Sequence, residues 1–343
     1  MKIKDLTCSS RTLVPRKSII EPIFDQKTIL AKSHWDYVEM YLKRKNNSDA
    51  LFYWNQAEVF YNASLNLPTL SAPLTLYYCF LNAAKALLTS KNEIFSKKHG
   101  VSSKYTSGNT NLKSEIVSFN TKGILAALSR YFGDISISGN HTMWELLYNV
   151  PFIHRSFNLT YPSESVELFI PIKNLRFVIS DFQHYGWFCF ATYEPYQNWH
   201  TINKIKALGF YEDKLHNKFT VRYTKRFKWY YKGNKRKSNF TRLKNYHSKF
   251  RRNLVYISGN NTHWYIKRTG VNGIVDRNPA CIIYAIMHRL SELSRYDPLT
   301  LSKHFEAKHN WLLTEFIEGA AEQFIDMIGC EITNSNIMKP GIR

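Results

Sequence analysis

The segment PLTLYYCFLNAAKALL, residues 73–88, is apolar nearly all round and carries a single charge, on Lys85. A helix without a polar face has to be buried on every side, so this segment predicts the centre of a helical scaffold. Pro73 suits the first turn of such a helix. Lys85 either extends its ammonium group towards the end of the helix, which avoids burying an unpaired charge, or reaches into a pocket.

Helical periodicity continues on both sides of this segment. Ser33 can cap a first helix, and Gly133 can end a later one. Much further along the chain, ACIIYAIMHRLSELSRY at 280–296 is again largely apolar, and we expect it to lie beside residues 73–88. The expected helices cover residues 33–45, 49–65, 71–90, 121–132, 141–148, 279–296 and 311–330.

Between these helical blocks the apolar pattern changes to a period of about two, and β-branched and aromatic residues dominate. The sequences KGNK at 232–235 and SGNN at 258–261 are typical of turns. The pattern predicts antiparallel strands at residues 166–172, 176–182, 187–193, 218–231, 253–259 and 263–270. We therefore expect an α+β fold with three parts: an N-terminal helical block at 1–160, an antiparallel β insertion at 161–275, and C-terminal helices at 276–343 that pack on the first block.

The most basic stretch of the chain lies inside this β region, from Lys214 to Arg252. It contains fifteen Lys and Arg, nine aromatic residues and no Asp or Glu, whereas the other 304 residues contribute only +6 to the net charge of +21. We expect this stretch to form the middle hairpin of the sheet and the connection that follows it. The excess of positive charge is therefore local.

A local excess of cations favours a polyanion as partner, because each phosphate that is neutralised releases condensed counterions. Interleaved aromatic rings can also stack on unpaired bases. The sequence thus predicts RNA or DNA binding, and an acidic protein partner or a solvated surface without a partner are the alternatives. The candidate nucleic-acid-binding residues are Arg222, Lys225, Arg226, Lys228, Trp229, Tyr231, Lys235, Arg236, Lys237, Arg242, Lys244, Lys249, Arg251 and Arg252.

Composition excludes several other classes of protein. The five cysteines are far apart and form no C-x-x-C motif, so neither a disulfide framework nor a zinc ribbon is expected. The N-terminus lacks an apolar run suited to a signal peptide, and no stretch approaches the ~20 apolar residues of a membrane span. We expect a cytoplasmic protein without a cofactor, since the common nucleotide-binding and esterase motifs are also missing.

Short motifs in the helical blocks resemble the YaaC-like family of bacterial proteins. In the first block they are Pro73-Leu74 with Leu76-Tyr77-Tyr78, Lys85-Ala86-Leu87-Leu88 and His99-Gly100, and in the second they are Ser294-Arg295-Tyr296-Asp297-Pro298, Gln323-Phe324-Ile325 and Lys339-Pro340. The family's helical layout is similar to HEPN-type domains, many of which are prokaryotic RNases of toxin or antiphage systems. The resemblance therefore implies a HEPN-like scaffold and a role in phage defence, and it does not extend to the basic β region.

The same resemblance raises the question of catalysis. HEPN nucleases use an Arg followed four to six residues later by a His, and Arg242 and His247 have this spacing. The spacing arises by chance as often as it is found, and this pair lies outside the helical blocks, so it is weak support for a nuclease.

A site in the helical core is the alternative, for an RNase or another phosphate-handling hydrolase. Its candidate catalytic residues are Lys85, His99, Arg289 and Arg295. Because Arg pairs equally well with carboxylate and phosphate, Arg295 either pairs with an acidic residue of a neighbouring helix or forms a composite site with Lys85 and His99.

No metal site is expected from the histidines. His304 and His309 are five residues apart, which would place them ~140° apart on one continuous helix. Such a pair does not match the i, i+4 spacing with which two histidines share a metal ion.

Overall fold

A computed structural model describes residues 3–104, 110–180, 184–213, 219–231 and 236–340 of the chain. The chain divides into two compact units. The helical unit comprises Leu30–Glu167, Asn272–Thr333 and Lys339–Arg343, and the sheet unit comprises Met1–Ile29, Leu168–Val271 and Asn334–Met338. The protein is therefore an α+β protein, as the sequence predicts, with an antiparallel sheet in a predominantly helical chain.

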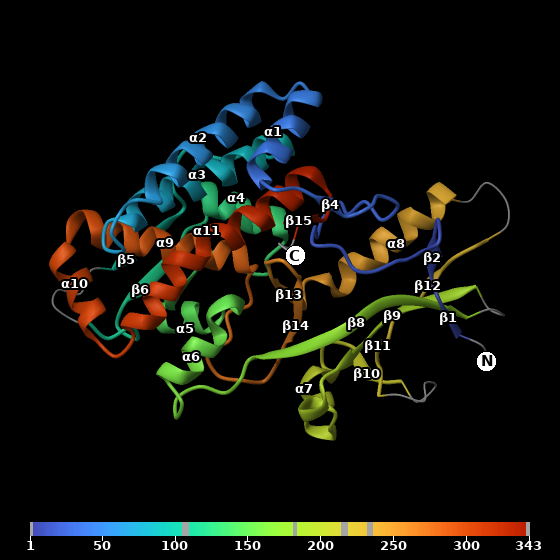
Figure 1. Cartoon of the computed structure of the whole chain (residues 1–343). Helices are drawn as coiled ribbons and strands as arrows, with labels where there is room; N and C mark the ends of the chain where they lie inside the picture. Colours follow the sequence, from blue (N-terminus) through green and yellow to red (C-terminus); the bar gives the residue numbers. More distant parts are fainter. Residues whose placement is uncertain (1–2, 105–109, 181–183, 214–218, 232–235, 341–343) are drawn as a thin grey trace. The chain divides into compact units, whose positions relative to one another are not determined.

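Helix α3 (Ala72–Ser90) lies at the centre of the helical unit (Figure 1). It contacts α2 (Ser48–Ser64), α9 (Pro279–Tyr296) and α11 (Asn310–Thr333). The rings of Phe80 and Phe324 stack 4.4 Å apart, and those of Tyr77 and Tyr284 meet edge-on at 5.6 Å. The two apolar helices expected to be neighbours are thus in contact, because each can bury its surface only against the others.

The other elements surround this central group of helices. Helix α1 (His34–Arg44) begins after Ser33, whose hydroxyl accepts from the Asp36 N–H, and α4 (Ile124–Phe132) ends at Gly133, which has a left-handed backbone conformation. A three-stranded antiparallel sheet is formed by β5 (Val101–Lys104), β6 (Ile116–Phe119) and β7 (Gly139–Thr142). The remaining short helices are α5 (Met143–Tyr148), η1 (Pro151–Ile153), α6 (His154–Thr160) and α10 (Pro298–Glu306).

The sheet unit is built on one antiparallel sheet with the strand order β10-β11-β9-β8-β14-β13. In that order the strands are Phe210–Glu212, Val221–Tyr223, Tyr185–Thr192, Phe169–Ser180, His263–Lys267 and Leu254–Ile257. Strand β1 (Ile3–Asp5) also pairs with β8, and β12 (Phe227–Lys228) with β9. The two strands expected at 166–172 and 176–182 are one long strand, β8, which an irregularity interrupts between Lys173 and Arg176.

Further short elements complete this unit. Strand β2 (Thr7–Cys8) pairs with β3 (Arg11–Thr12), and β4 (Ile29–Leu30) with β15 (Ile337–Met338). The 3-10 turn η2 (Glu194–Tyr196) and helix α7 (Trp199–Lys206), which the sequence analysis did not expect, follow β9.

The second half of the basic stretch is helical, which corrects the expectation of a hairpin and its connection. Helix α8 (Arg236–Arg251) lies along one face of the sheet (Figure 1). Its residues Leu243, Tyr246 and Phe250 join the buried core of that face, and the Phe250 ring stacks 4.4 Å from Phe188 of β9. The expected turn at 232–235 lies outside the described residues.

The opposite face of the sheet carries no helix in the described part of this unit. Because side chains alternate along a strand, Trp187 and Cys189 of β9 point away from the core side chains of Phe188 and Phe190. With Val178 of β8 they form a separate, smaller apolar cluster, which is buried beneath the surface of this face and against which Ile3 packs. We call this side of the sheet the open face.

The first 29 residues belong to the sheet unit, although the sequence analysis assigned them to the N-terminal helical block. Leu6, Leu13 and Phe24 are buried in the core of the sheet unit. These apolar residues are irregularly spaced, and Pro15 and Pro22 interrupt the segment, so no periodic pattern in the sequence indicated that they would be buried.

None of the helices in the described ranges is long and apolar enough to cross a membrane. The five cysteines are all unbridged, and four of them are buried.

Candidate functional site

Strands β11 and β12 bring part of the basic stretch to the open face. Val221 and Tyr223 point into the core, so Arg222 between them points outwards, and its guanidinium lies 5.5 Å from the Trp187 ring and 4.7 Å from the Tyr211 ring. Arg226 lies over the same Trp187 ring at 5.8 Å, and Lys228 lies over Tyr185 at 5.8 Å. Cation–π contacts of this kind hold the charged groups in place without neutralising them.

We name Arg222, Arg226 and Lys228, together with Lys225 in the connection between β11 and β12, the open-face cations. Lys225, Arg226 and Lys228 are exposed, and none of them forms an ion pair within the described residues. Arg222 is half-buried, with one guanidinium nitrogen 3.9 Å from the Asp213 carboxylate. Three positive charges are therefore fully available to an anion on this face.

The other cations in the described part of the stretch lie on α8 or directly after it, on the opposite side of the sheet. Lys237 and Lys249 are exposed, as is Arg252 just beyond the helix. Arg242 lies 5.1 Å from the Tyr230 ring, and Lys244 forms an ion pair of 2.9 Å with Glu21. The basic stretch is thus not one continuous surface, because the sheet separates the open-face cations from those of α8.

Two of the predicted contact residues are part of the core. Trp229 is 6 % exposed and packs between Phe227 and Phe240, so its ring cannot stack on a base. Arg251 is 2 % exposed and donates to the backbone carbonyl oxygens of Arg16, Lys17 and Leu254 at 2.6–2.7 Å. Lys235 and the side chain of Arg236 lie outside the described residues.

Three exposed aromatic rings of the described sheet unit remain as stacking candidates, and one of them is Tyr193, which is 43 % exposed beside Lys173. Tyr231, which the sequence analysis named, is 52 % exposed, with the Lys4 ammonium 5.2 Å from its ring centre. Trp199, which it missed, is 70 % exposed at the start of α7, followed on that helix by Lys204 and Lys206. A solvent-exposed Trp beside lysines could have been found only after α7 had been recognised as a helix.

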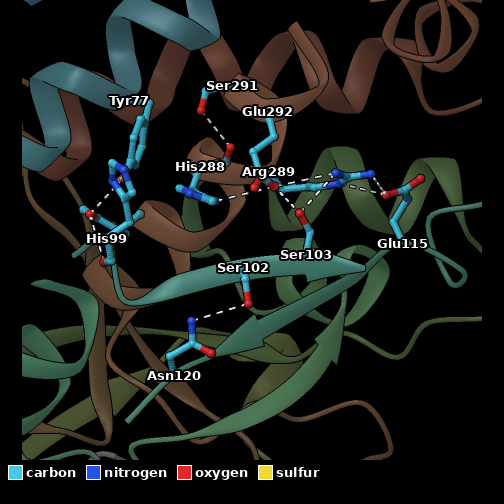
Figure 2. Close-up of polar contacts among 11 residues, drawn as sticks. Tyr77, His99, Ser102, Ser103, Glu115, Asn120, His288, Arg289, Ser291 and Glu292 are labelled. Carbon is cyan, nitrogen blue, oxygen red and sulfur yellow. Dashed lines mark hydrogen bonds and ion pairs between the residues drawn. The ribbon is translucent and has the colours of Figure 1, made fainter. Parts of the chain in front are cut away.

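The helical unit contains a second group of polar side chains, at α3, α9 and the loop between α3 and β5 (Figure 2). The Tyr77 hydroxyl is hydrogen-bonded to Nδ1 of His99, and it lies 3.2 Å from the Tyr284 hydroxyl. The His288 ring lies 4.9 Å from Tyr77 and 5.6 Å from His99. We name these four residues the His99 cluster.

Both histidines of this cluster have a lowered pKa, which favours the neutral imidazole. Desolvation of the imidazole, with the nearby charges of Arg295 and Lys85, lowers the pKa of His99, although part of the residue remains exposed. Burial, together with His99 and the two arginines of α9, lowers the pKa of His288 to about 3. A neutral imidazole at position 99 is the form that can accept a proton.

Arg289 is a structural residue. Its Nε and Nη2 donate to one Glu115 carboxylate oxygen at 2.9 and 2.6 Å, and both side chains are buried. Nη1 donates to the Ser103 hydroxyl at 3.1 Å, and that hydroxyl donates to Glu292 (Figure 2). Burial alone would raise the pKa of Glu115, but His304 and Arg289 hold this pKa below its usual range. The guanidinium is therefore committed to a buried carboxylate.

The polar chain continues from Glu115 through two histidines. His304 Nε2 lies 3.8 Å from Glu115, His304 Nδ1 lies 3.0 Å from His309 Nε2, and His309 Nδ1 lies 3.5 Å from the Tyr161 hydroxyl. The two imidazoles meet because α10 ends at Glu306, whereas the sequence analysis placed both on one continuous helix. Among the described residues no three His, Cys, Asp or Glu side chains are arranged to hold a metal ion.

Arg295 differs from Arg289. It is exposed, lies 4.3 Å from the Tyr296 ring and reaches the Tyr78 hydroxyl at 3.5 Å, and it has no carboxylate partner among the described residues. The expected ion pair of Arg295 with a neighbouring helix is therefore not found among the described residues, and Arg289 pairs instead with Glu115, which directly precedes β6. Lys85 is half-buried, 5.4 Å from the Tyr53 ring, and burial and Lys97 lower its pKa.

The Arg242 and His247 pair of the sheet unit does not form an accessible site. His247 is completely buried, and its Nε2 accepts from the Arg16 backbone N–H at 3.2 Å. Arg242 instead donates to the Asn239 side-chain oxygen at 3.2 Å.

Fold and site define an α+β protein of two units. The positive and negative charges of the helical unit nearly cancel, whereas the sheet unit is basic and has cations on both sides of its sheet. The chain belongs to the YaaC-like protein family, which matches residues 21–332 and therefore includes the basic β region as well as the helices. Neither the curated proteins nor the solved structures contain a match to the chain.

Proposed function

We propose that the protein binds nucleic acid through the open face of the sheet unit. The observation that supports this proposal most strongly is the uneven distribution of charge between the two units. The sheet unit contains 27 Lys and Arg against seven Asp and Glu, a formal charge of +20, whereas the helical unit contains 20 against 19, a charge of +1. A charge of this size in one compact unit attracts phosphate backbones over several ångströms and speeds their association.

The open face is favoured over α8 because its cations are held by aromatic rings. Long Lys and Arg side chains lose conformational entropy when they bind a phosphate. Aromatic rings of Trp187, Tyr211 and Tyr185 already restrict the side chains of Arg222, Arg226 and Lys228 in the free protein. Part of the conformational entropy is therefore lost before the phosphate binds. The aromatic rings beneath these cations support phosphate contacts, and the exposed rings of Tyr193, Trp199 and Tyr231 are available for stacking on bases.

The test is the salt dependence of single-stranded oligonucleotide binding. If the four open-face cations each contact a phosphate, log K should fall with log salt at a slope of about −3, from ~0.7 per phosphate. Replacing Lys225, Arg226 and Lys228 by Ala should flatten that slope by about two units. The matched control replaces Lys237, Lys249 and Arg252, which removes the same charge from the α8 side and should leave most of the slope unchanged.

Each outcome discriminates between the hypotheses. A larger effect of the control triple would move the binding face to α8. Binding that is absent at low salt, in a protein purified without a raised 260/280 nm absorbance ratio, would leave an acidic protein as the polyanionic partner. Cytoplasmic location and a role in phage defence are further parts of the proposal, and they rest on the sequence expectations alone.

A second candidate function, cleavage of a phosphate ester such as RNA, is favoured by one observation in the helical unit. His99 is hydrogen-bonded to Tyr77, the nearby charge of Arg295 helps to lower the His99 pKa, and Arg295 has no described carboxylate partner. An imidazole base beside an unpaired guanidinium is suited to accept a proton while the cation binds a phosphoryl oxygen.

RNA cleavage by purified protein tests this second function. His99→Ala and Arg295→Ala should each abolish cleavage with unchanged near-UV circular dichroism, whereas Arg155→Ala, an exposed arginine of the same unit, should cleave normally. Equal cleavage by all three variants, or none by the wild type, refutes the function.

A further inference from the structure

Strand β8 contains a β-bulge in the middle of the sheet. Lys173 pairs with Ala191 of β9, and Arg176 pairs with Cys189. Two residues of β8, Asn174 and Leu175, therefore lie opposite the single residue Phe190. Asn174 has a backbone φ of 55°, a left-handed conformation that Asn tolerates better than most residues.

The bulge changes the direction of a charged side chain. In a regular strand, residues three apart point to opposite faces. Because of the extra residue, Lys173 and Arg176 both lie on the side of Ala191 and Cys189, which is the open face. β-Bulges frequently redirect a side chain in this way next to binding sites.

The two cations line a pocket of about 440 Å³. Its wall is completed by Asn174, Ala191, Gln197, Phe219 and Thr220. Ala191 is the smallest side chain among them, and it leaves the space between the cations open. The volume falls in the range of small-ligand sites, and the lining combines cations, amide and hydroxyl groups with one aromatic ring.

The charges in the pocket are only partly balanced. Lys173 lies 4.6 Å from the Tyr193 ring and has no acidic partner among the described residues. Arg176 donates through Nη1 to the Asn174 carbonyl oxygen at 3.0 Å, and its Nε lies 3.1 Å from the Asp5 carboxylate of β1. Asp5 therefore competes with any anion that binds Arg176.

We propose that this pocket binds one nucleotide, with its phosphate between Lys173 and Arg176 and its base against the Phe219 ring. The proposal rests on the proposed nucleic-acid binding and gives it a specific position on the open face. A bound nucleotide would anchor a strand there, while the open-face cations follow the neighbouring phosphates.

The test fills the pocket without changing any charge. Binding of adenosine 5′-monophosphate and of a single-stranded oligonucleotide is measured by titration calorimetry for the wild type and for Ala191→Leu. We expect Ala191→Leu to weaken mononucleotide binding by about tenfold or more, the effect of losing one or two charge-assisted hydrogen bonds. The matched control is Ala207→Leu, the same substitution at an exposed position of the sheet unit, which should bind as the wild type does.

A second variant changes the charge in the opposite direction. Asp5→Asn removes the competing carboxylate from Arg176 and should tighten mononucleotide binding about fivefold, the size of a surface ion pair. Because this variant gains affinity, partial unfolding cannot produce the expected result.

The outcomes separate this proposal from the proposed function. If the oligonucleotide binds with a salt slope but the mononucleotide does not bind, or binds Ala191→Leu equally well, the pocket proposal is refuted and nucleic-acid binding stands. If neither ligand binds the wild type, the pocket proposal and the proposed nucleic-acid binding are both refuted. Inorganic phosphate that binds as tightly as the mononucleotide would refute the contact between the base and Phe219.

Discussion

Arg289 of the helical unit and Arg222 of the sheet unit are held in opposite ways. In the helical unit Arg289 is buried with two of its nitrogens on the Glu115 carboxylate, and in the sheet unit Arg222 lies between the Trp187 and Tyr211 rings. A carboxylate cancels the charge, whereas an aromatic ring supports the side chain and leaves its charge nearly intact. A basic composition therefore has to be located before it is interpreted, because Arg289 is paired with a buried carboxylate, whereas Arg226 and Lys228 are exposed and form no ion pair within the described residues.

The largest expected effect is on the buried ion pair. Arg289→Met leaves the Glu115 carboxylate buried without its main partner, and we expect a loss of ~3–5 kcal/mol in the free energy of unfolding, measured by urea denaturation. Adding Glu115→Gln to Arg289→Met should restore part of this loss. An unchanged unfolding midpoint would show that the pair does not stabilise the helical unit.

The next test concerns the tryptophan that the sequence assigned to binding. Trp229→Ala should destabilise the protein by ~3–5 kcal/mol, because it removes a large buried side chain from the core. Tyr231→Ala, at an exposed ring two residues further on, should change stability by less than ~0.5 kcal/mol and weaken single-strand binding by ~1 kcal/mol. Trp229→Ala that stays fully stable and loses binding would reverse this assignment.

Acid should weaken the helical unit through its buried histidines. Burial and neighbouring charges lower the pKa of His288 to about 3, and burial with His304 lowers that of His309 to about 4. As the pH falls below ~6.5, these histidines become protonated in the unfolded chain but stay neutral in the folded chain. Their contribution to the free energy of unfolding is therefore greatest above pH ~6.5 and decreases towards pH 4.

Urea denaturation at several pH values measures this loss. Each histidine contributes at most ~1.4 kcal/mol per pH unit, and His309→Asn should remove its share of the slope. A midpoint that does not move between pH 7.5 and pH 5 would contradict the neutral, buried state of both rings.

The smallest loss of stability is expected at Arg222, where the same substitution as at Arg289 can be compared directly. Arg222→Met should cost only ~0.5–2 kcal/mol of stability, the range of a cation–π contact, although it is the same substitution as in Arg289→Met. It should also reduce the salt slope of oligonucleotide binding by about 0.7. If Arg222→Met and Arg289→Met destabilise the protein equally, the two arginines do not differ in role.

The sequence predicted the helical unit better than the sheet unit. Residues 73–88 and 280–296 are so uniformly apolar that their burial and contact follow from composition. Helix α8 was not predicted, because its segment was interpreted only through its many positive charges. Its buried residues Leu243, Tyr246 and Phe250 nevertheless have the i, i+3, i+7 spacing of a helix. That signal could have been read from the sequence.

The sites depended on contacts that no local pattern contains. Arg251 is structural because Arg16 and Lys17 present backbone carbonyl oxygens to it from the far end of the chain. The pairing of His304 with His309 depends on where α10 ends, and the pocket on β8 depends on one extra residue opposite Phe190. Of the predicted catalytic residues, His99 and Arg295 lie in one neighbourhood, whereas Arg289 belongs to the buried ion pair.

The sheet unit is assembled from the beginning, the middle and the end of the polypeptide, and this has a consequence for its biosynthesis. The Lys17 ammonium donates to the Ile337 carbonyl oxygen at 2.8 Å, and the Arg251 guanidinium donates to the Lys17 carbonyl oxygen at 2.6 Å. At translation rates of ~5–20 residues per second, a ribosome needs roughly 15–60 s to pass from the first of these segments to the last. The segment around Lys17 therefore lacks these partners for that time, and the sheet unit cannot be completed before residues 334–338 have been synthesised.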